Sequence, residues 1–227
     1  MFPLSFARAA AVAVACGVVL TAGGCSHRPQ QPAAPAAASC ATEIEVPAQA
    51  VLQVDQVWPH TTSHMAGFQA AALDPAGCTD TAPTTAAACD KPFPWVAGTP
   101  AQAYATLARE HASTVVSGFI RGHRPVPEGT VIEPQEIRES IVLLDPAVVA
   151  ATTVIARHAG QCGDSFTGGN FTAYRVPTRS DVLDVPIDGI LVAARNLLIW
   201  LEFDERGWAP TDYGDIVAQA VANAVTA

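Results

Sequence analysis

The 227-residue sequence has few charged residues and almost no lysine. Charged side chains make up 15% of the chain, and Lys91 is the single lysine. With 21 acidic residues against 12 Lys and Arg residues, the formal net charge is −9. An acidic chain is repelled by polyanions, so we expect no nucleic-acid partner and no electrostatic docking on anionic lipid. We attribute the acidity to solubility.

Signatures of catalysis and of metal binding are also missing. No Gly-x-Ser-x-Gly nucleophile motif occurs, and residues 163–165 (Gly-Asp-Ser) are better explained as a polar turn. His60 and His64 have the i, i+4 spacing of a metal pair, but no Glu lies between them and no third ligand is near. The acidic cluster at residues 202–205 could supply an acid and a base, although an acidic strand end is the simpler interpretation. The sequence therefore predicts no catalytic site, no metal site and no cofactor.

The first 25 residues have the order of an export signal. Arg8 supplies a positive charge, and residues 9–22 form an apolar run that is too short to span a bilayer comfortably. Cys25 directly after two glycines resembles the bacterial lipobox, in which the signal is cleaved before the cysteine and the thiol is lipidated. That family prefers Leu three residues before the cysteine, where this chain has Ala22. We predict a signal peptide at residues 1–24.

Lipidation of Cys25 would place the protein on the extracytoplasmic face of the cell membrane, because two acyl chains suffice for stable anchoring. Plain secretion and a retained signal anchor are the alternatives. Residues 25–43 are rich in Ala and Pro and predict a disordered tether, and residues 44–227 predict one extracytoplasmic domain. Removing the signal makes the net charge one unit more negative, because the signal holds Arg8 and no acidic residue.

Four cysteines remain for the domain. In an oxidising compartment their default state is two disulfides, and four cysteines allow three pairings. Zinc is disfavoured because no Cys-x-x-Cys spacing occurs. These cysteines are Cys40, Cys78, Cys89 and Cys162.

Hydrophobic periodicity predicts an α+β fold with a twisted, mainly antiparallel sheet flanked by helices. The strand at 196–203 is apolar on both faces, which is typical of a central strand. We expect residues 59–98 to form a long irregular region. The remaining expected elements are a strand and short helix at 45–58, helices at 101–111, 145–161 and 210–225, a turn at 167–170, and strands at 114–120, 136–144, 171–176 and 187–193.

Three segments carry a resemblance to a known family. They are Pro-Ala-Gln-Ala-Tyr at 100–104 before the strand at 115–120, the apolar strand that runs into Asp145-Pro146 and a helix ending at Cys162, and the strand at 196–203 before the closing helix. In this order the chain resembles the extracellular sensor domain of mycobacterial PknH-like receptor kinases and the actinobacterial lipoproteins built on that domain. The resemblance implies an antiparallel sheet flanked by helices around a cleft.

The same resemblance bears on the disulfides. It implies that Cys162 pairs with Cys78 or Cys89. The family often has a second bridge late in the domain, but this chain has no cysteine after Cys162, so its other pair would involve Cys40. We favour Cys89–Cys162 together with Cys40–Cys78.

Ligand binding or sensing at the cell envelope is the function that we expect, without enzymatic activity. Trp95 lies in an irregular Pro-Phe-Pro-Trp stretch and could line a groove, and His111, Arg121 and Arg138 could contact an anionic wall fragment or lipid. The expected partners are the membrane, through the N-terminal lipid, and an envelope ligand or membrane protein. A structural or assembly lipoprotein and an envelope hydrolase are the alternatives.

Overall fold

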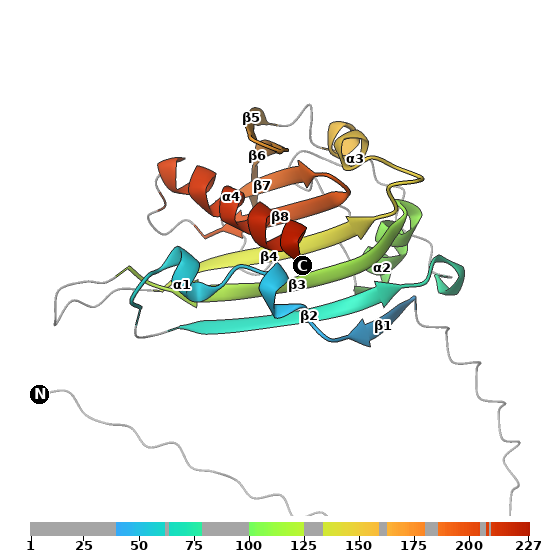
Figure 1. Ribbon diagram of the computed structural model, residues 1–227, viewed down its shortest axis with the longest axis horizontal. Coiled ribbons are helices and arrows are strands. Elements are labelled where there is room, and N and C mark those ends of the chain that lie inside the picture. The colour runs from blue at the N-terminus through green and yellow to red at the C-terminus, as the bar shows by residue number, and fades with distance from the viewer. Residues whose placement is uncertain are drawn as a thin grey trace, which may run out of the picture. The chain divides into compact units, whose positions relative to one another are not determined.

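The computed structural model describes residues 40–61, 64–78, 100–124, 134–158, 163–179, 186–204, 208 and 210–227. Within them, eight strands form one antiparallel sheet in the order β1-β2-β3-β4-β8-β7-β6-β5 (Figure 1). Helices lie against both faces of this sheet, so the predicted α+β class is confirmed. The predicted signal peptide and Cys25 lie outside the described residues.

The elements have the following bounds. The strands are β1 Ala41–Ile44, β2 Met65–Leu73, β3 Ala112–Gly122, β4 Gln135–Leu144, β5 Asp164–Gly168, β6 Phe171–Arg179, β7 Pro186–Ala194 and β8 Leu197–Phe203. The helices are α1 Val54–Val57, α2 Pro100–Arg109, α3 Ala151–His158 and α4 Pro210–Thr226, with short 3-10 turns η1 Ala48–Ala50 and η2 Pro75–Gly77.

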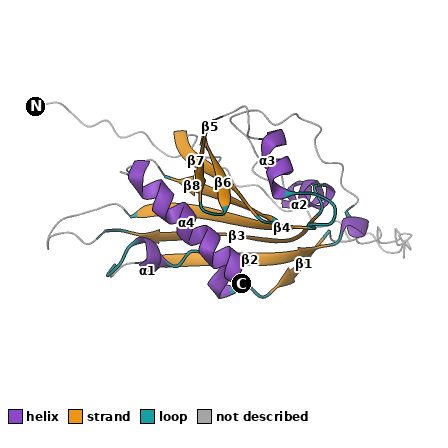
Figure 2. Ribbon diagram, turned by 45° about the horizontal axis from the view of Figure 1, so that its top comes forward, coloured by secondary structure: helices purple, strands orange, loops and turns teal. Residues whose placement is uncertain are grey.

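Two apolar cores sit on the two faces of the sheet. On one face, α4 and the segment that holds η1 and α1 pack over β3, β4, β8 and β7, and α4 runs diagonally across the strands (Figure 2). On the other face, α2 and α3 cover the half of the sheet that includes Val115, Val142 and Leu198. Strand β8 lies between β4 and β7 with residues in both cores, so its predicted central position is confirmed. No helix in the described part of the chain is long and apolar enough to cross a membrane.

Strand β2 contradicts the prediction of a continuous irregular region at 59–98. Its sequence, MAGFQAAAL, holds four alanines among nine residues, and alanine has little intrinsic preference for strands. It is a strand because Ala70 packs into one core and Ala71 into the other, between β1 and β3. Small side chains on both faces are compatible with a strand when tertiary packing supplies the stabilisation.

Three other boundaries differ from the predictions. No strand begins at residue 45 as predicted, because β1 spans Ala41–Ile44 and so also begins before the predicted start of the domain at 44. The helix expected from Asp145 begins at Ala151, because the Asp145 carboxylate accepts from the backbone N–H of Ala147 in a separate turn. The expected polar turn at 163–165 falls within the edge strand β5.

A disulfide joins Cys40 and Cys78. It links the start of β1 to the end of η2, next to the pairing of Ala41 with Leu73. The favoured Cys40–Cys78 pairing is confirmed. This bond removes Cys78 as a partner for Cys162, and Cys89 and Cys162 themselves lie outside the described residues.

Candidate functional site

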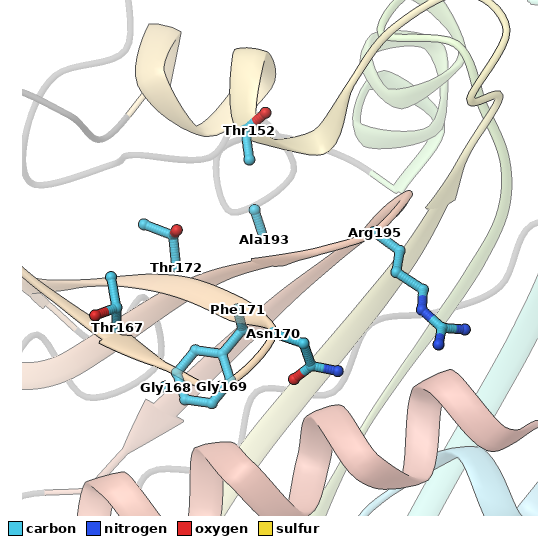
Figure 3. Close-up of a pocket in the computed structure, with 9 residues that line it drawn as sticks. All are labelled: Thr152, Thr167, Gly168, Gly169, Asn170, Phe171, Thr172, Ala193 and Arg195. Carbon is cyan, nitrogen blue, oxygen red and sulfur yellow. The ribbon is translucent and has the colours of Figure 1, made fainter.

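A pocket of about 360 Å³ opens between the first turn of α3 and the tips of two hairpins (Figure 3). Thr152 lines it from α3, Arg195 from the β7–β8 turn, and residues 167–172 from the β5–β6 hairpin. Ala193, buried in β7, lies at its base. Ligand pockets in proteins begin at roughly 300 Å³, so this one suits a small molecule.

The sheet register brings the two hairpin tips together. Thr172 of β6 pairs with Ala193 of β7, so the β5–β6 turn lies beside the β7–β8 turn although about 25 residues separate them in the chain. The β7–β8 turn is fixed from the other side, because the side-chain amide of Asn196 donates to the carbonyl of Leu144 at 3.1 Å. In Figure 3 the side chains of Asn170 and Arg195 extend to the same side of their turns.

Arg195 adopts a left-handed backbone conformation with φ of 54°. This region is unfavourable for a residue with a Cβ by roughly 1 kcal/mol, and Gly or Asn usually occupies it. A strained residue at a pocket rim is a signal of function rather than of stability. The guanidinium is also exposed and forms no ion pair with the described residues.

Other arginines differ from Arg195 in this respect. Each of five has a carboxylate partner within 4 Å in the described part of the chain: Arg121, Arg124, Arg138, Arg157 and Arg175. The polar side-chain groups that line the pocket are three hydroxyls, one amide and one guanidinium, with no carboxylate, imidazole or thiol among them, and Phe171 and Ala193 add apolar surface. The pocket thus presents a positive charge and hydrogen-bonding groups on an acidic chain, which suits a small anion.

Two of the sequence-predicted ligand residues, Arg121 and Arg138, lie together on the sheet. Both bind Glu136: Nε of Arg121 donates to Oε2 at 3.1 Å and Nε of Arg138 to Oε1 at 2.9 Å. Burial raises the pKa of Glu136, but the two guanidinium hydrogen bonds outweigh it and hold the pKa below its usual range. The positive charge of both arginines is therefore partly compensated within the fold, and their role in ligand binding stays a prediction.

The other predicted or considered residues are dispersed. His111 lies before the start of β3, at the opposite end of the strand from Arg121 and so roughly 30 Å away. Its backbone is left-handed, with φ of 62°, and its carbonyl accepts from the N–H of Asp145. Trp95 lies outside the described residues. No group of three potential metal ligands occurs in the described part of the chain.

Two members of the acidic cluster, Glu202 and Asp204, have structural partners, and Glu205 lies outside the described residues. Oε1 of Glu202 accepts from the indole N–H of Trp200 at 2.8 Å, and Oδ1 of Asp204 accepts from that of Trp208 at 3.0 Å. These bonds satisfy two partly buried indole groups. The interpretation as an acidic strand end fits this geometry better than an acid–base pair.

Glu139 carries a buried carboxyl group that the sequence did not predict to be buried. Glu139 of β4 is 1% exposed, and its Oε2 accepts from the backbone N–H of Leu52 at 2.8 Å. Burial raises the pKa of Glu139 to about 8, and the Leu52 hydrogen bond opposes this only in part. Its Oε1 has no hydrogen-bond partner among the described residues. The raised pKa favours the protonated form of Glu139, which lies in the core under the η1–α1 segment.

A second polar group on the same face is fully paired. Arg175 donates to both carboxylate oxygens of Asp188, at 3.2 and 2.7 Å, and the hydroxyl of Tyr213 donates to Oδ2 at 2.6 Å. Burial raises the pKa of Asp188, but these bonds outweigh it and leave the pKa lowered. Because Tyr213 belongs to α4, the cluster fixes the first turns of that helix to β6 and β7.

Comparisons with known proteins found no relative of this chain. No protein-family model, curated protein or solved structure matches the chain. Of the pocket residues, 167–170 were predicted as a turn, Arg195 lay between two predicted strands, and the others were predicted as parts of a helix or of strands. Their convergence depends on the pairing of β6 with β7, and the charged residue at a left-handed turn position is the one signal that the sequence could have offered.

Proposed function

We propose that the chain is a lipid-anchored, extracytoplasmic protein that binds a small anionic ligand at the cell envelope without chemical turnover. The pocket around Arg195 carries this proposal, because three hydroxyls and a guanidinium without an ion pair among the described residues line it on an acidic chain. Phosphate monoesters and carboxylated sugars are the ligands that such groups bind.

The lining groups favour binding over hydrolysis. A hydrolase needs a nucleophile or an activated water with a base in reach. The threonine hydroxyls of the pocket have no imidazole or carboxylate beside them among the lining residues. A positive site without a base holds an anion and leaves its bonds intact.

The location rests on the sequence and is supported by one covalent bond. The charge, apolar run and cysteine of residues 1–25 have the order of a lipoprotein signal. The Cys40–Cys78 disulfide fits an oxidising compartment outside the cytoplasm. The resemblance to PknH-like sensor domains points to the same compartment and role.

Titration calorimetry on the purified chain tests the ligand. We expect inorganic phosphate and glycerol 3-phosphate to bind and glucose, which is neutral, to bind at least tenfold more weakly. Arg195→Gln should abolish phosphate binding, because it replaces the charged guanidinium with a shorter, neutral amide. Arg157→Gln is the matched control, since Arg157 is also half exposed but bonds to Glu110 away from the pocket lining. Equal binding by the two variants would reject the site.

A further inference from the structure

Strand β2 has a free edge over five residues. β1 pairs only with the end of β2, from Ile44 opposite Ala70 to Ala41 opposite Leu73. Residues 65–69 pair with β3 on one side and have no strand on the other in the described part of the chain. Figure 1 shows this part of β2 as the lower border of the sheet, with β1 alongside only its far end.

This edge has none of the charged residues or prolines that prevent exposed strand edges from pairing with other strands. No charged residue and no proline occurs in Met65–Leu73. Met65 is 55% exposed, and Ala66, Gly67 and Gln69 are exposed as well. Natural sheets protect such edges with charges, prolines or bulges, because unpaired N–H and C=O groups recruit another strand. An open, neutral edge on a chain of net charge −9 indicates that a strand binds there.

We propose that the strand is β2 of a second copy of this chain, in an antiparallel, two-fold symmetric pair centred on Gly67. Residue 65 of one copy then lies opposite residue 69 of the other, and 66 opposite 68. Such an interface is closed, since the two-fold axis uses the 65–69 edge of both copies and leaves that edge unavailable to a third copy. The window has no ionisable side chain, so pairing brings no like charges face to face.

The course of β1 leaves room for this partner. β1 is antiparallel to β2 and ends at Ile44, after which Val46 packs into the core under α4. The partner β2 would run in the same direction as β1 and begin, at its Met65, where Ile44 ends. Ile44 is 38% exposed and Met65 is 55% exposed, and the alternation of side chains places them on opposite faces of the joined sheet at this junction. The pair joins two eight-stranded sheets into one.

A charge-swap experiment tests both the edge and its register. In Met65→Lys/Gln69→Lys, each new lysine faces another lysine across the interface, whereas in Met65→Lys/Gln69→Glu each lysine faces a glutamate. Within one copy the two positions are four residues apart on a strand, roughly 13 Å, so the swap acts mainly between copies. Val148→Lys is the control, because Val148 is 54% exposed and lies in the turn after β4.

The readout is sedimentation equilibrium of the full chain in density-matched detergent. We expect a monomer–dimer equilibrium for the wild type and for Val148→Lys, a dimer weaker by about tenfold or more for the Lys/Lys variant, and recovery in the Lys/Glu variant. A wild type that stays monomeric at every concentration would overturn the proposal. Equal association of the two double variants would also overturn it, and thermal melts of both show that they remain folded.

Discussion

The backbone N–H of Leu52 donates a 2.8 Å hydrogen bond to Oε2 of Glu139, a carboxyl group that is 1% exposed. The bond joins the segment between η1 and α1 to the central strand β4. Asn223 of α4 holds the same segment from above, because its side-chain amide donates to the carbonyl of Val51 at 2.9 Å. A sheet strand, a crossing segment and the C-terminal helix thus share one buried polar connection.

Glu139 should make the protein less stable as the pH rises. Its pKa is 4.5 in an unfolded chain and about 8 in the folded protein, so the folded state binds the proton more tightly. The stabilisation is complete below the unfolded pKa and is lost between these two values, by up to about 1.4 kcal/mol per pH unit. Glu139→Gln, which mimics the protonated acid, should remove this slope. Urea unfolding from pH 5 to pH 8 measures it.

The comparison with Glu139→Gln isolates this effect from the other carboxylates. The pKa values of Glu136 and Asp188 are lowered, so their stabilisation is present above the ordinary carboxyl pKa and is lost as the pH falls. Their contribution is the same in both proteins and cancels in the difference. Parallel stability curves for wild type and variant across this pH range would contradict a protonated Glu139.

Arg195→Gly should raise stability and abolish anion binding. Glycine occupies the left-handed region without strain, so the variant should gain about 1 kcal/mol in free energy of unfolding. The same change removes the guanidinium from the pocket. Chemical denaturation and phosphate titration measure the two effects. A less stable variant would show that Arg195 is kept for the fold and not for a ligand.

Gly189→Ala should destabilise the fold, and Gly214→Ala should stabilise it. A Cβ at Gly189 would lie 2.1 Å from the Trp200 ring, which is buried, so overpacking should cost about 1–3 kcal/mol. A Cβ at Gly214 in α4 meets nothing within 4 Å, and alanine in a helix interior gains up to about 1 kcal/mol. Thermal melts that shift in the same direction for both variants would contradict the packing of β7 on Trp200.

Removal of the Cys40–Cys78 bond should destabilise the protein without abolishing the fold. The two residues are 38 positions apart, and closing a loop of that size in the unfolded chain contributes about 3–4 kcal/mol in the chain-entropy model. The double variant Cys40→Ser/Cys78→Ser should therefore unfold at a lower urea concentration. β1 has only four residues and should lose amide protection first. Unchanged protection of β1 would show that its ladder with β2 suffices.

The sequence predicted elements well where side chains carry a clear period. β3, β4 and β8 combine β-branched or apolar residues with alternation, and α4 has a regular apolar stripe, so each was found within a few residues. β2 was missed because alanine gives no such signal and its stability comes from packing between β1 and β3. β5 was missed because an edge strand of mostly exposed residues has the composition of a turn.

The candidate site could not be predicted from the sequence, because it depends on which strands pair. A turn was predicted at 167–170, and Arg195 lay between the strands predicted at 187–193 and 196–203, but the proximity of the two turns depends on the pairing of β6 with β7. Arg121 and Arg138 were selected because charge is scarce, and the structure pairs both with Glu136. The sequence indicated that Glu139 is a polar residue in a half-exposed strand. In the structure the segment around Leu52 covers it.

The intact mass of the membrane-extracted protein, taken before and after reduction, tests the central claim most directly. The account predicts a chain that begins at Cys25, with the added mass of at least two acyl groups and a gain of two hydrogens on reduction for each disulfide, the Cys40–Cys78 bond included. A protein recovered from the cytosol with Met1 in place, no acyl mass and no mass change on reduction would contradict it.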